Sequence, residues 1–406
     1  MISRSLIEKI FAAASIERWN DHPRPVQFTE LAKQAHKMII AYVIARHEED
    51  RGKSVHWQFL IEGGIFEFLH RVILTDIKPP VFHKLMAHKK ERDKLNLWVV
   101  ERLQNDLEAL SPALFNRFSH YLLTDPDSNR ERKILRAAHY LATKWEFDYI
   151  YEWSRPLYGI DATKDEINRQ IEEHRELGAV QTMLMNRELP DTEKGIYGFI
   201  ALVGQLRFQK RWAQTPRIPE TSVLGHLLIV AILSYFIALE IGACPRRSYN
   251  DFFGGLFHDL PEVLTRDIIS PVKNSVEGLD DLIKEYERQA MEEKVYPLIP
   301  FEWRREIRYF TEDEFLNRIW PADNSSPQIL HSEEIEETLN NDEHNPIDGR
   351  VIEACDKFSA FVEASLSMRT GITSPALDEA KRKLYARYAN KKLYGFPVGM
   401  LFDFFW

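Results

Sequence analysis

The sequence lacks the features that mark disulfide-rich, fibrous or strand-built proteins. Its 406 residues include two cysteines, Cys244 and Cys355, which cannot build a disulfide framework. The 17 glycines and 20 prolines are not enriched, which excludes a fibrous or low-complexity chain. Alternating strand-like runs joined by Asn-Gly or Asp-Gly turns are nearly absent. We therefore expect a cytoplasmic protein with two buried thiols and few strands.

A basic excess is also missing. The formal net charge is −9, and 28% of the residues are charged against 44% that are hydrophobic. These values are ordinary for a soluble globular protein, and they disfavour binding to bulk nucleic acid, which usually needs a basic surface. A small anionic substrate remains compatible with the sequence because it needs only a few local cations.

The apolar runs of the sequence predict no membrane-spanning helix. The longest, Leu227–Leu239, has 13 residues and is apolar except for Ser234. A spanning helix needs about 20 apolar residues, so we expect a helix buried inside the protein and no membrane contact. The N-terminal MISRSLIEKIFAAASIERW is predicted to form an ordinary first helix and not a signal peptide.

Most of the chain is predicted to be helical. Apolar residues recur at spacings of three and four in Phe28–Arg46, Lys133–Tyr151, Asp280–Tyr296 and Arg350–Met368. The segments Leu123–Arg130 and Asp323–Pro327 are polar loops. The pattern predicts an all-α protein.

An internal repeat divides the chain into two halves. Gly63–Phe82 (GGIFEFLHRVILTDIKPPVF) and Gly254–Lys273 (GGLFHDLPEVLTRDIISPVK) are identical at nine of 20 positions, where chance gives about one. Upstream, RWNDHPR and RWAQTPR begin at residues 18 and 211, and each precedes a helix that carries a histidine, His36 or His226. We therefore predict two related helical domains in tandem, at residues 1–190 and 191–406.

The second half contains a candidate metal site centred on His258-Asp259. An adjacent imidazole and carboxylate can supply one nitrogen and one oxygen to a divalent cation. Glu262 follows His258 by one helical turn and suits a base or orienting role toward water. A histidine–aspartate pair alone is common, so its significance depends on further ligands.

Two more residues can complete the set. His226 begins the most apolar helix, where a lone histidine is more often a satisfied core residue than a ligand. Asp356 lies in VIEACDKFSAFVEA among apolar neighbours, and a buried aspartate must be paired, hydrogen-bonded or bound to metal. Two imidazoles and two carboxylates suit one Mn, Fe, Co, Ni or Zn ion better than Ca.

The order of these residues resembles that of the HD-domain metal phosphohydrolases, and among them the bacterial 5′-deoxynucleotidases. The resemblance covers about Gly195 to Leu393, and the matching stretches are Arg211-Trp212, His226, HDLPEVLTRDIISPVK (258–273) and ACDKFSAFVEA (354–364). It implies an HD-type fold in which the metal is bound by His226, His258, Asp259 and Asp356. It further implies that Glu262 assists water, Arg211 meets phosphate, and Trp212 and Asp267 shape the sugar pocket.

The residue types agree with these roles, although each has a simpler explanation. Arg211 offers a planar fork for phosphate oxygens, and otherwise is a surface arginine. Trp212 can form a flat wall against a sugar or base, and otherwise packs in the core. Asp267 can accept a hydrogen bond from a sugar hydroxyl or cap a helix. Lys273 adds positive potential to the site or is simply solvated.

Two positions depart from the family pattern and leave the substrate open. Gly225 precedes His226 where the family commonly has glutamate, and Arg266 stands where a small residue is usual.

The first half is expected to be catalytically inactive. His36 is retained as the counterpart of His226, but Glu67-Phe68 replaces His258-Asp259, and phenylalanine cannot bind a metal. Arg71 replaces Glu262, and His139 corresponds to Asp356. A rearranged site of His36, Glu67 and His139 is the alternative. Members of the resembled family often pair as homodimers, so the two halves are expected to form an intramolecular pseudo-dimer.

The expected activity is removal of the 5′-phosphate from a small nucleotide, a (deoxy)nucleoside monophosphate, by water activated at the metal. The alternatives are triphosphohydrolase, cyclic-nucleotide phosphodiesterase or alarmone hydrolase activity, a nucleotide sensor without catalysis, and a helical interaction protein with a relic site.

Overall fold

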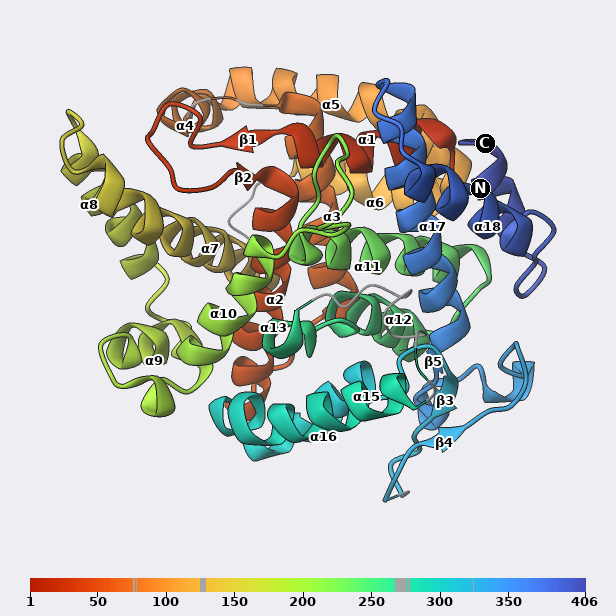
Figure 1. The fold of residues 1–406 in the computed structure, drawn as a ribbon. Coiled ribbons are helices and arrows are strands. Elements are labelled where there is room, and N and C mark those ends of the chain that lie inside the picture. Colours follow the sequence, from red (N-terminus) through yellow and green to blue (C-terminus); the bar gives the residue numbers. More distant parts are fainter. Residues whose placement is uncertain (76, 78, 125–128, 267–275, 277, 324) are drawn as a thin grey trace. The chain divides into compact units, whose positions relative to one another are not determined.

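The computed structural model describes residues 1–406 except 76, 78, 125–128, 267–275, 277 and 324 (Figure 1). Helices account for 69% of the structure and strands for 4%, which confirms the predicted all-α class. The chain divides into two compact units, Met1–Val180 and Gln181–Trp406. The boundary that the sequence predicts, between residues 190 and 191, lies ten residues later.

The first unit consists of helices and one two-stranded antiparallel pair (Figure 1). Its elements are α1 (Arg4–Ala12), β1 (Glu17–Arg18), β2 (Phe28–Thr29), α2 (Glu30–Asp50), α3 (Trp57–Leu74), α4 (Pro79–Ala87), α5 (Lys89–Leu110), α6 (Pro112–Leu123), α7 (Arg130–Ser154) and α8 (Ile160–Glu172), and α9 (Gly178–Asn186) crosses the boundary.

Helix α2 is the central element of the first unit. It begins after Thr29, whose side chain accepts a hydrogen bond from the backbone N–H of Ala32, and every residue from Glu30 to Ala45 is buried. The helix packs against α3 and α7. The buried stretch includes two lysines, Lys33 and Lys37, which require polar partners inside the protein.

The second unit is also helical, with a small three-stranded antiparallel sheet of order β4-β3-β5. Its elements are α10 (Ile196–Gly204), α11 (Val223–Glu240), α12 (Pro245–Phe257), α13 (Glu262–Thr265), α15 (Leu279–Ala290), α16 (Phe301–Thr311), β3 (Asn317–Ile319), β4 (Gln328–Ile329), β5 (Ile347–Asp348), α17 (Gly349–Arg369), α18 (Pro375–Tyr388) and α19 (Val398–Asp403).

Helix α11 forms the core of the second unit. Every residue from Val223 to Ala238 is buried, and the helix packs against α12 and α17. By length and composition α11 alone among the described helices is apolar enough to cross a membrane, but 89% of it is buried inside the protein. The backbones of α11 and α12 approach so closely that a Cβ added at Gly255 would lie 2.9 Å from the Cα of Ala231. A larger residue at Gly255 would therefore push the two helices apart.

The predicted helices are present, with shifted ends. The helices expected at 28–46, 133–151 and 350–368 are α2, α7 and α17, and each extends beyond the predicted range at its C-terminal end. The helix expected at 280–296 is α-helical only to Ala290 and continues as a π-helical turn, Met291–Val295. Periodicity therefore located the helices but not the change in helix type.

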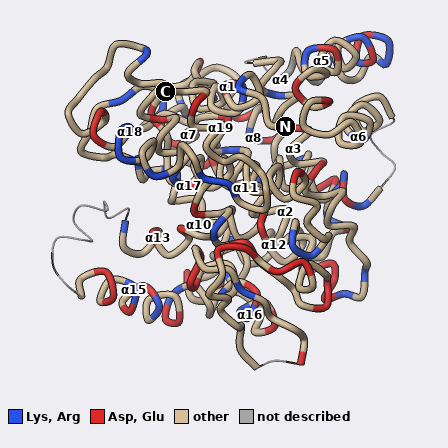
Figure 2. Tube along the Cα trace, turned by 90° about the vertical axis from the view of Figure 1, so that its right-hand side faces the viewer, with Lys and Arg blue, Asp and Glu red and all other residues tan. Residues whose placement is uncertain are grey.

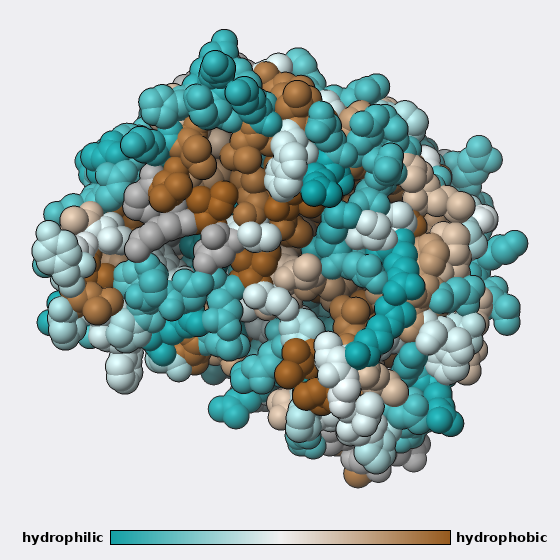
Figure 3. All heavy atoms as spheres, turned by 90° about the horizontal axis from the view of Figure 1, so that it is seen from above, coloured by the Kyte–Doolittle hydropathy of each residue, from teal (hydrophilic) through white to brown (hydrophobic). Residues whose placement is uncertain are grey.

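The surface is mixed in character. Acidic and basic residues alternate along α15 (Figure 2), and apolar side chains are exposed among hydrophilic ones on the face shown in Figure 3. Both cysteines are free thiols, and Cys355 is buried as expected, whereas Cys244 is only partly buried.

Candidate metal centre

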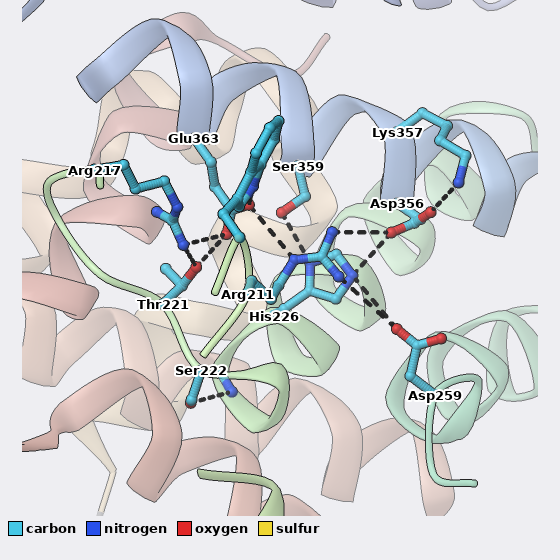
Figure 4. Close-up of polar contacts among 12 residues, drawn as sticks. Arg211, Arg217, Thr221, Ser222, His226, Asp259, Asp356, Lys357, Ser359 and Glu363 are labelled. Carbon is cyan, nitrogen blue, oxygen red and sulfur yellow. Dashed lines mark hydrogen bonds and ion pairs between the residues drawn. The ribbon is translucent and has the colours of Figure 1, made fainter. Parts of the chain in front are cut away.

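The first candidate ligand, His226, is held in the core by the start of α11. The Ser222 side chain caps this helix by accepting a hydrogen bond from the backbone N–H of Gly225. His226 lies one turn further on and is fully buried. Its Nδ1 is 3.1 Å from the Ser359 hydroxyl of α17, so Nε2 is the atom that faces the site (Figure 4). Burial and the nearby Arg211 guanidinium lower the pKa of His226, which favours the neutral imidazole that a metal requires.

The second candidate ligand, His258, stands at the C-terminal end of α12. Its Nδ1 lies 2.9 Å from the carbonyl oxygen of Gly255, which can accept the Nδ1 proton. This bond leaves the Nε2 lone pair available to a metal, and it fixes the orientation of the ring. The close approach of α12 to α11 at Gly255 brings the rings of His258 and His226 to 5.5 Å between centroids.

The two carboxylates come from different segments. Asp259 follows α12 directly, and its Oδ2 lies 3.1 Å from His258 Nε2 and 4.0 Å from His226 Nε2. Asp356 projects from α17, and its Oδ1 lies 2.9 Å from His226 Nε2. Burial raises the pKa of Asp259, but the adjacent His258 outweighs it and brings that pKa to about 2. Burial likewise opposes ionisation of Asp356, but Lys357 and His226 hold its pKa well below the usual range.

These distances are compatible with one shared cation. Ligand atoms about 2.1 Å from a metal lie about 3.0 to 3.4 Å apart at octahedral or tetrahedral angles. Among the described residues, the set of metal-ligand side chains whose donor atoms all lie within 4.8 Å of one another is His226, His258 and Asp259. Asp356 joins this set through its short distance to His226.

The two imidazole Nε2 atoms face carboxylate oxygens at 2.9 and 3.1 Å, but not in the alignment of a good hydrogen bond. Buried polar atoms without a partner are costly, and a metal ion would satisfy both. The donor set therefore fits a transition metal.

Arg211 stands beside these ligands. It lies in the loop before α11 and is mostly buried. Its guanidinium nitrogens are 3.9 Å from Asp259, 3.6 Å from Asp356 and 3.5 Å from Glu363 (Figure 4). These separations exceed those of close charge-assisted hydrogen bonds. The guanidinium therefore faces the same space as the candidate ligands.

A carboxylate that the sequence analysis did not identify, Glu363, holds the arginine loop. It is buried on α17, and it accepts hydrogen bonds from Trp212 Nε1, at 2.9 Å, and from the Thr221 hydroxyl. Burial raises its pKa, but Arg217 and Arg211 outweigh this and lower that pKa to about 2. Glu363 follows Asp356 by seven residues, two helical turns, so the spacing placed it on the same helix face.

A cavity lies next to the metal ligands. It has a volume of about 120 Å³, and its lining includes His258, Asp259 and Glu262. Glu262 is buried at the first position of α13. It therefore lies in the cavity wall beside two candidate ligands, as a residue that orients water must.

Two predicted substrate residues, Asp267 and Lys273, lie outside the described residues, so their roles remain predictions. Their neighbour Arg266 is described and has a positive φ of 67°.

Two residues of the alternative site in the first half contact lysines. Glu67 is paired with Lys37, and His139 Nδ1 lies 2.5 Å from Lys33 Nζ. His36, Glu67 and His139 do not gather as metal ligands in the described part of the chain. These contacts do not support the rearranged site, which stays an untested alternative.

Parts of this chain are similar to known proteins. Residues 203–385 match the family model described as HD domain, and the four candidate ligands lie within that segment. The chain is 28% identical over 125 residues to a 5′-deoxynucleotidase of Vibrio vulnificus strain YJ016, a match that covers 28% of this chain and 59% of that protein's length. A solved structure of an HD-domain phosphohydrolase from Listeria innocua is similar at a TM-score of 0.36 and 18% identity, over 48% of this chain and 80% of that one.

Proposed function

We propose that residues 203–385, which match the HD domain family model, form a metal-dependent phosphohydrolase that removes the 5′-phosphate from (deoxy)nucleoside monophosphates. The observation that carries the proposal is the convergence of two imidazoles and two carboxylates beside one guanidinium. This arrangement offers a cation site and a phosphate-binding group within a few ångströms of each other. The name of the Vibrio vulnificus relative supports the choice of substrate.

Four candidate ligand residues would together hold the cation. Nε2 of His226 and Nε2 of His258 provide nitrogens, and Asp259 and Asp356 provide oxygens. A divalent transition metal bound by these residues would supply Lewis acidity toward water and phosphate.

Other residues act on the substrate and on water. Arg211 binds phosphate oxygens and stabilises the charge that develops on them during transfer. Glu262, in the cavity wall, orients the attacking water and accepts its proton. The leaving group is the 5′ oxygen of the nucleoside. Trp212, fixed by its bond to Glu363, forms a flat wall for the sugar or base.

The charges around the cavity favour a monophosphate. Among the described residues, its lining carries seven carboxylates and two cationic side chains: Asp259, Glu262, Asp280, Glu287, Glu312, Asp313 and Glu314, and Lys284 and Arg288. A longer phosphate chain that entered this cavity would meet like charge, which is destabilising. One phosphate bound at Arg211 avoids most of that repulsion.

A matrix of metals and nucleotides tests the proposal. The purified protein, stripped with chelator and reloaded with Mn, Co, Fe, Ni or Zn, is assayed against ribo- and deoxynucleoside monophosphates for released phosphate. Asp259→Ala should reduce metal-dependent turnover to background with the helical content retained. Asp281→Ala, an exposed change on α15, is the matched control and should keep full activity.

The same matrix separates the alternatives. Release of triphosphate from a nucleoside triphosphate, opening of a cyclic nucleotide or release of pyrophosphate from an alarmone would each identify another hydrolase activity. Tight nucleotide binding without turnover on every metal would indicate a sensor. Wild-type activity in Asp259→Ala would contradict the assignment of the site itself.

A further inference from the structure

We infer that the first unit is a second HD-type module in which the side-chain amino groups of Lys33 and Lys37 stand where the second unit gathers metal ligands, so that it binds no divalent cation. The inference concerns Met1–Val180 and uses the proposed metal site only as its reference.

The loops that carry the Arg-Trp pairs have the same backbone geometry. In the first unit Glu17 pairs antiparallel with Thr29, and in the second Lys210 pairs antiparallel with Ser222. Both pairs are related by the same shift of 193 residues (210 − 17 and 222 − 29). The shared shift indicates that one loop structure has been used twice.

The tryptophans agree in conformation and in partner. Trp19 and Trp212, also 193 positions apart, have φ values of 57° and 58°, which side-chain-bearing residues rarely adopt. Each donates its indole N–H over 2.9 Å to a buried glutamate, Trp19 to Glu146 and Trp212 to Glu363. Glu146 on α7 therefore corresponds to Glu363 on α17. Such agreement in a strained conformation and a buried bond is not expected by chance.

The helix caps identify the residue that replaces His226. Thr29 caps α2 and Ser222 caps α11, each through a bond from the backbone N–H three residues later. Four residues after each cap stand Lys33 and His226 (33 − 29 and 226 − 222). Lys33, not His36, is therefore the counterpart of His226, and the pairing of the two histidines from sequence is wrong.

Lys33 makes the contact that this correspondence requires. Counting back seven residues from Glu146 and from Glu363 gives His139 and Asp356. Lys33 Nζ lies 2.5 Å from His139 Nδ1, in the place where His226 Nε2 lies 2.9 Å from Asp356 Oδ1. A contact between two metal ligands in one unit is thus a lysine–histidine hydrogen bond in the other.

A second lysine, Lys37, lies at the place that corresponds to the other candidate ligands. Glu67 corresponds to His258 in the internal repeat, and its carboxylate binds the Lys37 amino group and accepts a hydrogen bond of 2.6 Å from Tyr121. Phe68, at the position of Asp259, offers no ligand atom. Lys33 and Lys37 are fully buried, so their amino groups occupy interior space. The groups that would bind a cation are replaced or already bonded to amines.

The arginine in this unit is also engaged. Arg18, the counterpart of Arg211, forms ion pairs of 2.9 Å with Glu30 and 2.8 Å with Glu146. The corresponding Arg211 pairs are 3.5 Å or longer. Arg18, Glu30 and Glu146 therefore pair with one another, and these ion pairs stabilise the first unit without a metal.

Metal content and local stability test the inference on the full-length protein. Wild type, stripped and reloaded with Mn²⁺, should hold one ion per chain by mass spectrometry, and Asp259→Ala should hold none. Two ions per chain in wild type would overturn the inference. No metal in either protein would contradict the proposed function instead. The Lys37→Met measurement described next would then test the inference on its own.

Lys37→Met removes the partner of Glu67 and should destabilise α2 whether or not metal is present. Hydrogen exchange of α2 peptides, measured across a urea series, should show that α2 opens at a urea concentration about 1 M lower in Lys37→Met than in wild type. Lys383→Met, an exposed change on α18, is the control and should leave the α2 midpoint unchanged. Equal midpoints for the two variants, or a Lys37→Met defect that Mn²⁺ repairs, would overturn the inference.

Discussion

Replacing Glu363 by glutamine should weaken both the fold and substrate binding, because one buried carboxylate holds the loop that carries Arg211 and Trp212. The surroundings bring the pKa of Glu363 from 4.5 to about 2. At about 1.4 kcal/mol per unit, this shift corresponds to about 3 kcal/mol in favour of the ionised, folded state. Glutamine keeps the shape but loses the charge. Its amide has one acceptor oxygen, so it cannot accept both the indole N–H of Trp212 and the Thr221 hydroxyl as the two carboxylate oxygens do.

We expect Glu363→Gln to lose about 2 to 3 kcal/mol in the free energy of unfolding. KM for the nucleoside monophosphate should rise about tenfold, with a smaller change in kcat, because Arg211 and Trp212 lose their orientation. Urea unfolding and initial-rate kinetics measure the two effects. Glu353→Gln, on the same helix but paired with more exposed arginines, is the control and should lose less than about 1 kcal/mol. Equal unfolding free energies and equal KM values for the two variants would refute the reasoning.

Three further predictions follow from the structure. Arg211→Lys keeps the charge but loses the planar fork, so KM should rise by about 10- to 100-fold in initial-rate assays, and an unchanged KM would contradict the phosphate role. Burial raises the pKa of Glu30, but Arg18 outweighs it and lowers that pKa from 4.5 to about 2. The stability that Glu30 contributes is therefore present above pH 4.5 and lost as the pH falls toward 2. The gap between wild type and Glu30→Gln in unfolding free energy should narrow by up to about 3 kcal/mol over that range, and a constant gap would contradict the assignment. Residues 191–406 expressed alone should be less stable and less active than the full chain, and a stable, fully active monomer would contradict the pseudo-dimer proposal.

The sequence predicted the helices and the ligand order because both depend on local pattern and residue type. The apolar run around Leu227–Leu239 required a buried helix, and α11 is buried from Val223 onward. The placement of His226 and Asp356 within 2.9 Å could not be derived from spacing, because it depends on how α11 packs against α17. Glu363 was missed although its position two turns after Asp356 was visible in the sequence. This spacing identifies Glu363 as a site residue only when the hydrogen-bond partners of its carboxylate are known.

Under the inferred correspondence of the two units, Lys33 takes the place that the sequence analysis gave to His36, for a physical reason. Matching residue type paired His36 with His226, but the cap of α2 sets the register of the helix and places Lys33 at that position. The interval from Lys33 to Glu67 is two residues longer than that from His226 to His258 (34 against 32), which the matching of histidines concealed. Backbone caps and positive-φ residues locate equivalent positions better than residue identity does.

The central claim is that four side chains of the second unit hold one divalent cation. Anomalous diffraction from crystals loaded with Mn²⁺ tests it directly. The account predicts one strong peak about 2.0 to 2.3 Å from Nε2 of His226, Nε2 of His258 and the carboxylates of Asp259 and Asp356. A peak elsewhere, or crystals in which the loaded protein shows no peak between these residues, would contradict it.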